Sequence, residues 1–128
     1  MSQTFTKGTV KVTGSVTTSI GSLGLPVTGA SQTLININQT GNSANQNVYT
    51  VTAGKTFYLY GYQTSSTSSG LTVYKSDGTT VLGQHLTNAS DSAGSVVSSV
   101  PIWSYAATTN VVCKCTTGKV YNIWGVEQ

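Results

Sequence analysis

The chain has 128 residues, which suits one domain, or one small domain with an arm. Charged residues make up only 7% of it, against about 25% in an ordinary globular protein, and the formal net charge is +3. Its six basic residues are scattered lysines and arginine is absent, so the composition disfavours a nucleic-acid-binding protein.

Residues 1–46 predict an extended, β-rich N-terminal arm. Residues 7–20 alternate between apolar and polar side chains with period two, and a shorter apolar run covers residues 33–38. Two lone strands cannot bury their own apolar faces, so this arm must pack on the following domain, on a neighbouring subunit or on a larger scaffold. The candidate assembly residues are the apolar side chains of the two runs: Val10, Val12, Val16, Ile20, Leu34, Ile35 and Ile37.

Residues 47–128 predict an antiparallel β-sandwich, which makes the whole chain all-β. The strands are expected at 47–51, 56–63, 71–76, 79–82, 96–106 (interrupted at Pro101), 110–116 and 119–126. Short strands at spacings of about ten residues are typical of a sandwich or barrel. Among sandwiches, a jelly-roll-like fold is the first choice and an immunoglobulin-like fold the second.

Two turns predict strand pairings. Asp77-Gly78 lies between alternating runs, which favours a type I′ hairpin with Tyr74 opposite Val81 and Val73 opposite Leu82. Thr117-Gly118 predicts a second hairpin, between the last two strands. That register places Val112 opposite Ile123 and Cys113 opposite Asn122.

The chain lacks the residues that catalysis would need. Its three carboxylates, Asp77, Asp91 and Glu127, are scattered, and its one histidine, His85, has no spaced metal ligand. We therefore expect no catalytic, metal or cofactor site, and we expect that the chain is not an enzyme.

The two cysteines lie two positions apart, so they share one face of a strand. A disulfide between such neighbours would be strained. Cys113 and Cys115 are therefore expected to be reduced core thiols.

A stripe of tyrosines is the main candidate surface. Phe57 and Leu59 share one face of their predicted strand, so the other face carries Tyr58, Tyr60 and Tyr62. If the first face fills the core, the tyrosines point outward. They could then form a subunit interface, a glycan platform or an ordinary surface.

Three segments resemble a known group of proteins. The run Val51-Thr-Ala-Gly-Lys-Thr-Phe-Tyr-Leu59 resembles the opening of jelly-roll domains in virion proteins of tailed bacteriophages. The ending, 120–127, is similar to their terminal strand, and the Val-x-Val-Thr-Gly-Ser-Val pattern of residues 10–16 is similar to their β-rich N-terminal arms. The resemblance covers roughly half the chain. It implies an external virion component, often trimeric, without catalytic residues.

This resemblance leads to a functional expectation. The chain is expected to be a capsid decoration protein on the outer surface of a phage head, with the major capsid protein and itself, as a homotrimer, as partners. It shows no export signal or membrane-spanning run, so we expect assembly in the host cytoplasm and no membrane association. One alternative is a tail or fibre module that binds a receptor or a host surface glycan. Another is a strand-exchanging fibre or pilus-like subunit.

Overall fold

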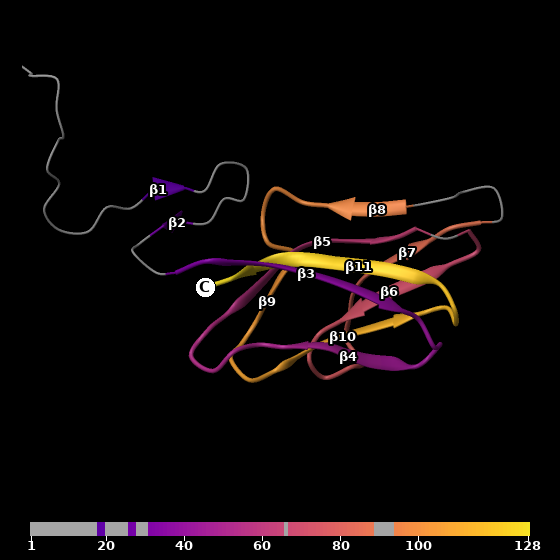
Figure 1. Cartoon of the computed structure of the whole chain (residues 1–128), viewed down its shortest axis with the longest axis horizontal. Helices are drawn as coiled ribbons and strands as arrows, with labels where there is room; N and C mark the ends of the chain where they lie inside the picture. Colours follow the sequence, from indigo (N-terminus) through magenta and orange to yellow (C-terminus); the bar gives the residue numbers. More distant parts are fainter. Residues whose placement is uncertain (1–17, 20–25, 28–30, 66, 89–93) are drawn as a thin grey trace, which may run out of the picture.

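A computed structural model describes residues 18–19, 26–27, 31–65, 67–88 and 94–128, which form eleven β-strands and no helix (Figure 1). The strands are β1 (Thr18–Ser19), β2 (Pro26–Val27), β3 (Thr33–Thr40), β4 (Asn45–Thr50), β5 (Phe57–Thr64), β6 (Gly70–Tyr74), β7 (Val81–Leu86), β8 (Gly94–Val97), β9 (Trp103–Tyr105), β10 (Asn110–Cys115) and β11 (Val120–Glu127). The expected all-β class is confirmed.

The strands from β3 onward form two antiparallel sheets. One sheet has the order β4-β10-β6-β7, and the other has the order β3-β11-β5-β8, with β9 also paired to β5. Among the described residues, β1 and β2 pair with each other and form a separate two-stranded sheet. Along the chain, each connection from β3 to β11 passes from one sheet to the other, except at β6–β7 and β8–β9. The pairing is therefore almost entirely between segments that are distant in sequence.

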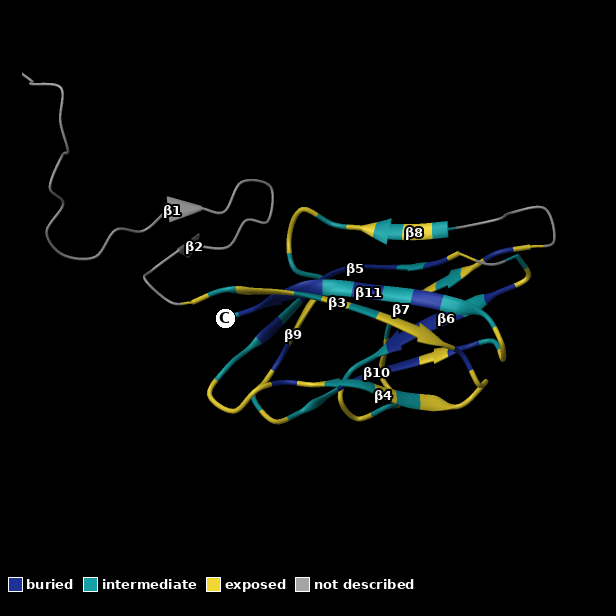
Figure 2. Cartoon of the chain, in the orientation of Figure 1, coloured by how far each residue is buried: buried dark blue, intermediate teal, exposed yellow. Residues whose placement is uncertain are grey.

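The two sheets share one hydrophobic core, as in a β-sandwich. Inward side chains come from β5, β6, β10 and β11 at alternate positions, as expected for pleated strands. The buried cluster comprises Val51, Phe57, Leu59, Tyr62, Leu71, Val73, Tyr105, Val111, Cys113, Cys115, Tyr121 and Ile123. Figure 2 shows that buried residues predominate on β5, β6 and β10, whereas β3 is mostly exposed or intermediate.

A β-bulge interrupts the alternation of β5. Trp124 of β11 pairs with Gly61, but the next residue, Gly125, pairs with Leu59, so Tyr60 is the extra residue of β5 in this register. A bulge reverses which side of the sheet the following residues face. Leu59 points into the core before the bulge and Tyr62 does so after it.

Part of the predicted N-terminal arm belongs to the sandwich. Thr33–Thr40 is the edge strand β3, paired with β11 over its full length, from Thr33 opposite Glu127 to Thr40 opposite Val120. Ile35 and Ile37 pack against the core, and Leu34 points away from it. The other candidate arm residues, Val10, Val12, Val16 and Ile20, lie outside the described residues.

The β6–β7 hairpin forms, but with a different turn. Tyr74 is opposite Val81 as expected, whereas Val73 is opposite Gly83 because the register shifts between Val73 and Tyr74. The predicted type I′ turn is wrong, since it needs positive φ at both central residues and only Gly78 has it, at 69°. The Asp77 carboxylate instead accepts hydrogen bonds from the amides of the two following threonines, both at 2.8 Å.

The predicted pairing of the last two strands is wrong. The turn at Gly118 is present, with φ 75°, but β10 pairs with β4 and β6 while β11 pairs with β3 and β5. The turn therefore carries the chain across the sandwich. Cys113 and Ile123 are both buried in the shared core, on opposite sheets.

Candidate functional site

The outer face of the β3-β11-β5-β8 sheet carries a group of apolar side chains. Two adjacent rows cross this sheet, with Leu34, Val126 and Tyr58 in the first and Asn36, Trp124, Gly61 and Val97 in the second. Tyr60, at the bulge, clusters with Tyr58, Trp124 and Val126, separately from the core. We call this surface the Trp124 face.

The Trp124 face contains a groove beside the indole. A Cβ atom added to Gly61 would lie 2.1 Å from the Trp124 ring, so the indole rests directly against the backbone of β5. The groove has a volume of about 250 Å³ and is lined by Leu34, Ile35, Asn36, Tyr60, Trp124, Gly125 and Val126. Leu34 is 78% exposed and Val97 is 71% exposed, so water contacts apolar surface on both sides of the indole.

This face is also free of charge. The next row across the sheet consists of Asn38, Asn122, Gln63 and Ser95. None of the three rows contains an ionisable carboxylate, ammonium or imidazole. Covering the face with a protein surface would therefore require no charged group on it to lose its hydration.

The structure divides the predicted tyrosine stripe. Tyr58 and Tyr60 lie on the outer side of β5, as expected, although Tyr60 is only 1% exposed. The prediction is wrong for Tyr62, which the bulge turns into the core. Its hydroxyl lies 2.1 Å from where a Cβ of Gly83 would be, so it reaches across the sandwich to β7. Burial raises the pKa of both Tyr60 and Tyr62.

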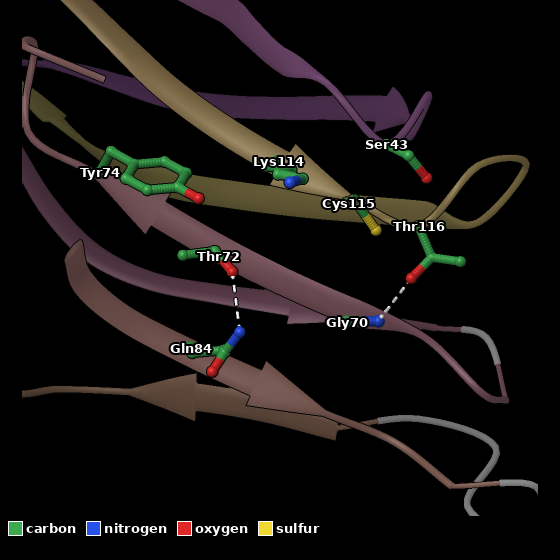
Figure 3. A pocket seen from close by; sticks show the side chains of 8 residues that line it. All are labelled: Ser43, Gly70, Thr72, Tyr74, Gln84, Lys114, Cys115 and Thr116. Carbon is green, nitrogen blue, oxygen red and sulfur yellow. Dashed lines mark hydrogen bonds between the residues drawn. The ribbon is translucent and has the colours of Figure 1, made fainter. Parts of the chain in front are cut away.

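A second, polar surface lies on the outer face of the other sheet. It is a hollow of about 240 Å³, lined by Ser43, Gly70, Thr72, Tyr74, Gln84, Lys114, Cys115 and Thr116 (Figure 3). Lys114, Thr72 and Gln84 form one row across β10, β6 and β7. Within this row the Gln84 amide donates a hydrogen bond to the Thr72 hydroxyl at 3.1 Å. We call this site the Thr72 hollow.

Sequence reasoning missed the Thr72 hollow. Its side chains come from β6, β7, β10 and the loop before β4, and no local motif joins these segments. The one available signal was Lys114, a lysine that alternates with Cys113 and Cys115 and so had to face outward from the core.

Glu127 is a buried carboxylate near the end of β11. Its Oε2 accepts hydrogen bonds from the Tyr49 hydroxyl at 2.6 Å and from the Thr52 amide at 2.9 Å. Burial by itself would raise the pKa of Glu127. The two hydrogen bonds and the nearby Lys55 charge outweigh it, so the pKa of Glu127 lies below its ordinary value of 4.5. This carboxylate ties the C-terminal strand to β4 and the following loop.

Replacing Glu127 by glutamine should lower the free energy of unfolding by about 1 kcal/mol at neutral pH. The side-chain oxygen of glutamine can still accept both hydrogen bonds, but the negative charge of the carboxylate is lost. The depressed pKa means that this stabilisation is complete above pH 4.5 and is lost as pH falls through the folded-state pKa. Urea titrations of both proteins across the acid range would show the difference shrinking to zero.

The Tyr49→Phe background provides the control. Without the tyrosine hydroxyl, Glu127→Gln should cost less, and its effect should disappear at a higher pH. A cost that stayed constant down to strongly acidic pH would show that the carboxylate charge is not its source.

Among the described residues, the remaining titratable groups form no candidate reaction centre. Across the ranges that the structure describes, no three His, Cys, Asp or Glu side chains gather to hold a metal ion. Cys113 and Cys115 are buried and form no disulfide, as expected. Burial and the neighbouring Cys115 raise the pKa of Cys113 to about 12, so this thiol stays protonated at neutral pH. Hydrogen bonds from Thr80 and Thr79 hold the pKa of Asp77 far below its ordinary value.

Comparison with known proteins adds no assignment. No protein-family model matches the chain, and no curated protein matches it. No helix in the described part of the chain has the length and apolar character to cross a bilayer. The Trp124 face and the Thr72 hollow are therefore the surfaces from which a function is inferred.

Proposed function

We propose that this chain is a non-enzymatic structural protein that assembles with other copies of itself through the Trp124 face and the edge strand β3. The observation that carries this proposal is the three-row, uncharged outer face around Trp124, which includes the strongly exposed Leu34 and Val97. Exposed apolar side chains on an uncharged face of this kind are found at protein contacts. A second copy supplies an equally uncharged surface.

The edge of β3 supports the same proposal. Edge strands of monomeric proteins are usually protected by lysines, prolines or bulges, because an open edge pairs with other chains. β3 is eight residues long, contains none of these devices and pairs continuously with β11. Its outer edge can therefore accept a strand from a neighbouring copy, with main-chain hydrogen bonds adding to apolar burial.

We further propose that the sandwich is a jelly roll. This fold has eight strands in two four-stranded sheets, in which most connections pass between the sheets. If β8 and β9 are taken as one strand interrupted before Trp103, the strands from β3 to β11 number eight. The order β3-β11-β5-β8 places the first and last strands of the sandwich, β3 and β11, side by side. The order β4-β10-β6-β7 does the same with the second strand, β4, and the next to last, β10. This arrangement supports the expectation from sequence.

Within this class, the specific role that we propose is capsid decoration on the outer surface of a tailed-phage head. It rests on the resemblance of residues 51–59 and 120–127 to phage virion jelly rolls. The partners would be the major capsid protein and two further copies of this chain, on a virion assembled in the host cytoplasm. An N-terminal attachment arm would end before β3, because β3 is a strand of the sandwich.

Leu34→Lys tests the assembly proposal. The substitution places a charge on both the edge strand and the Trp124 face, so we expect the purified full-length protein to change from oligomer to monomer, with at least a tenfold weaker self-association constant. Mass from light scattering measures this directly. Leu86→Lys is the matched control, because Leu86 is 65% exposed on β7, the edge strand of the other sheet.

The outcomes separate the alternatives. A wild-type monomer at all concentrations, or an oligomer insensitive to Leu34→Lys, would refute assembly through this face. A discrete trimer would favour the decoration protein. Open-ended polymers would favour the strand-exchanging fibre subunit, for which the unprotected edge of β3 is the specific observation.

A further inference from the structure

We propose that the Thr72 hollow binds a single uncharged sugar ring, presented as the terminal unit of a glycan. This inference goes beyond assembly, since the hollow and the Trp124 face lie on different sheets. It also differs from a tyrosine platform on β5, because it uses Tyr74 of β6.

The shape of the hollow follows from the sizes of its side chains. Two of the three residues that the central strand, β6, contributes are small: Gly70 and Thr72. Longer side chains, Gln84 and Lys114, rise from the strands on either side of it. Tyr74 lies at one end of the hollow and Thr116 at the other (Figure 3). The result is a basin with an aromatic end wall and polar sides.

The rim opposite Tyr74 is held in place by hydrogen bonds. Ser43 has a left-handed backbone, with φ 62°, and its hydroxyl oxygen accepts hydrogen bonds from the Thr117 amide at 3.0 Å and hydroxyl at 2.8 Å. The Thr116 hydroxyl accepts a hydrogen bond from the Gly70 amide at 2.9 Å. A site whose polar groups are fixed in advance loses less entropy when it binds a ligand.

The chemistry of the lining matches a sugar. A pyranose ring has apolar C–H faces and a rim of hydroxyls that each donate and accept hydrogen bonds. The Tyr74 ring supplies a face for the C–H groups. The Gln84 amide uses one N–H on Thr72, which leaves its carbonyl oxygen as an acceptor and its second N–H as a donor. Lys114 adds the N–H donors of its ammonium group.

Size and charge exclude other ligand classes. The volume of about 240 Å³ is below the roughly 300 Å³ at which pockets for drug-sized ligands begin, so one ring fits better than a peptide or cofactor. A phosphate site usually offers several cationic or backbone N–H donors, whereas Lys114 is the one charged group of this lining. Metal ligands are also lacking, because the lining contains no carboxylate or imidazole and Cys115 is fully buried.

The test is a titration of the isotopically labelled full-length protein, followed by amide NMR. The probes are the methyl glycosides of glucose, galactose, mannose and N-acetylglucosamine, with inorganic phosphate as the anion probe. We expect at least one glycoside to shift the amides of Thr72, Gln84 and Lys114 saturably, with an affinity in the millimolar range typical of a small contact area. Phosphate should cause no saturable shift there.

Two substitutions should weaken glycoside binding about tenfold each, Tyr74→Ala by removing the ring and Gln84→Ala by removing the amide. The matched controls are Tyr58→Ala and Gln39→Ala on the other sheet, which should leave the affinity unchanged. Tyr74→Ala keeps the backbone oxygen of residue 74, which accepts a hydrogen bond from the Tyr105 hydroxyl at 2.7 Å. Leu34→Lys should also leave sugar binding intact, which separates this proposal from assembly.

Several results would overturn the proposal. One is the absence of saturable shifts with all four glycosides. Another is a sugar response that is lost in Tyr58→Ala and retained in Tyr74→Ala, which would place the site on the Trp124 face. A third is phosphate binding that depends on Lys114 without any glycoside binding, which would make the hollow an anion site.

Discussion

Replacing Gly125 by alanine is expected to lower the free energy of unfolding by about 3 kcal/mol or more. A Cβ atom at this position would lie 2.0 Å from the Tyr58 carbonyl oxygen and 2.6 Å from the Phe57 ring. The first contact involves backbone, so no side-chain rotation can relieve it. The β11–β5 pair, which connects the Trp124 face to the core, would have to separate.

Gly118→Ala is the control for this prediction. Gly118 has φ 75°, and no atom lies within 4 Å of the place that a Cβ would take, so alanine there should cost only the left-handed backbone penalty of about 1–2 kcal/mol. Urea denaturation measures the free energy of unfolding of each variant, and the two values can be compared if the m-value is the same for both. Equal costs would mean that β11 and β5 are less closely packed than the structure shows.

Tyr62→Ala is expected to cost about 3–5 kcal/mol, the range for removing a large aromatic side chain from a core. Tyr62 is 3% exposed and belongs to the main buried cluster. Tyr58→Ala, four residues earlier in the same strand but on the outer face, should cost about 1 kcal/mol. Similar costs for the two variants would contradict the bulge at Tyr60.

A double-mutant cycle tests the contact of Tyr62 with the opposite sheet. Gly83→Ala should destabilise the protein, because its Cβ would lie 2.1 Å from the Tyr62 hydroxyl oxygen and 3.0 Å from ring atom Cζ. Tyr62→Phe removes the closer atom, so the double variant should recover part of the loss. Strictly additive costs would show that Tyr62 does not reach β7.

The positions of the strands could be predicted from the sequence, but several of their pairings could not. The runs expected at 56–63 and 110–116 correspond to β5 and β10 within one or two residues. The predicted pairing of Val112 with Ile123 was wrong because both strands direct alternate residues into the core. That pattern is the same whether they lie side by side or face each other across a core.

The candidate surfaces were predicted only in part, for a similar reason. Tyr58 and Tyr60 were correctly placed opposite Phe57 and Leu59, because strict alternation holds up to the bulge. No residue pattern indicated that Tyr60 would be the extra residue, so Tyr62 was placed on the wrong face. Leu34 was expected in an arm, and its role as an exposed edge residue depends on pairing with Val126, 92 positions later.

The position of the turn at Asp77-Gly78, although not its type, and the inward positions of Cys113 and Cys115 show what the sequence by itself determined. Backbone preference and period-two alternation act over a few residues, so they specify where turns and strands occur. Only the tertiary structure decided that β11 lies between β3 and β5, and that Trp124 rests on Gly61. It also brought Thr72, Gln84 and Lys114 into one row. These arrangements depend on pairing between distant strands, which is selected by the packing of the whole core.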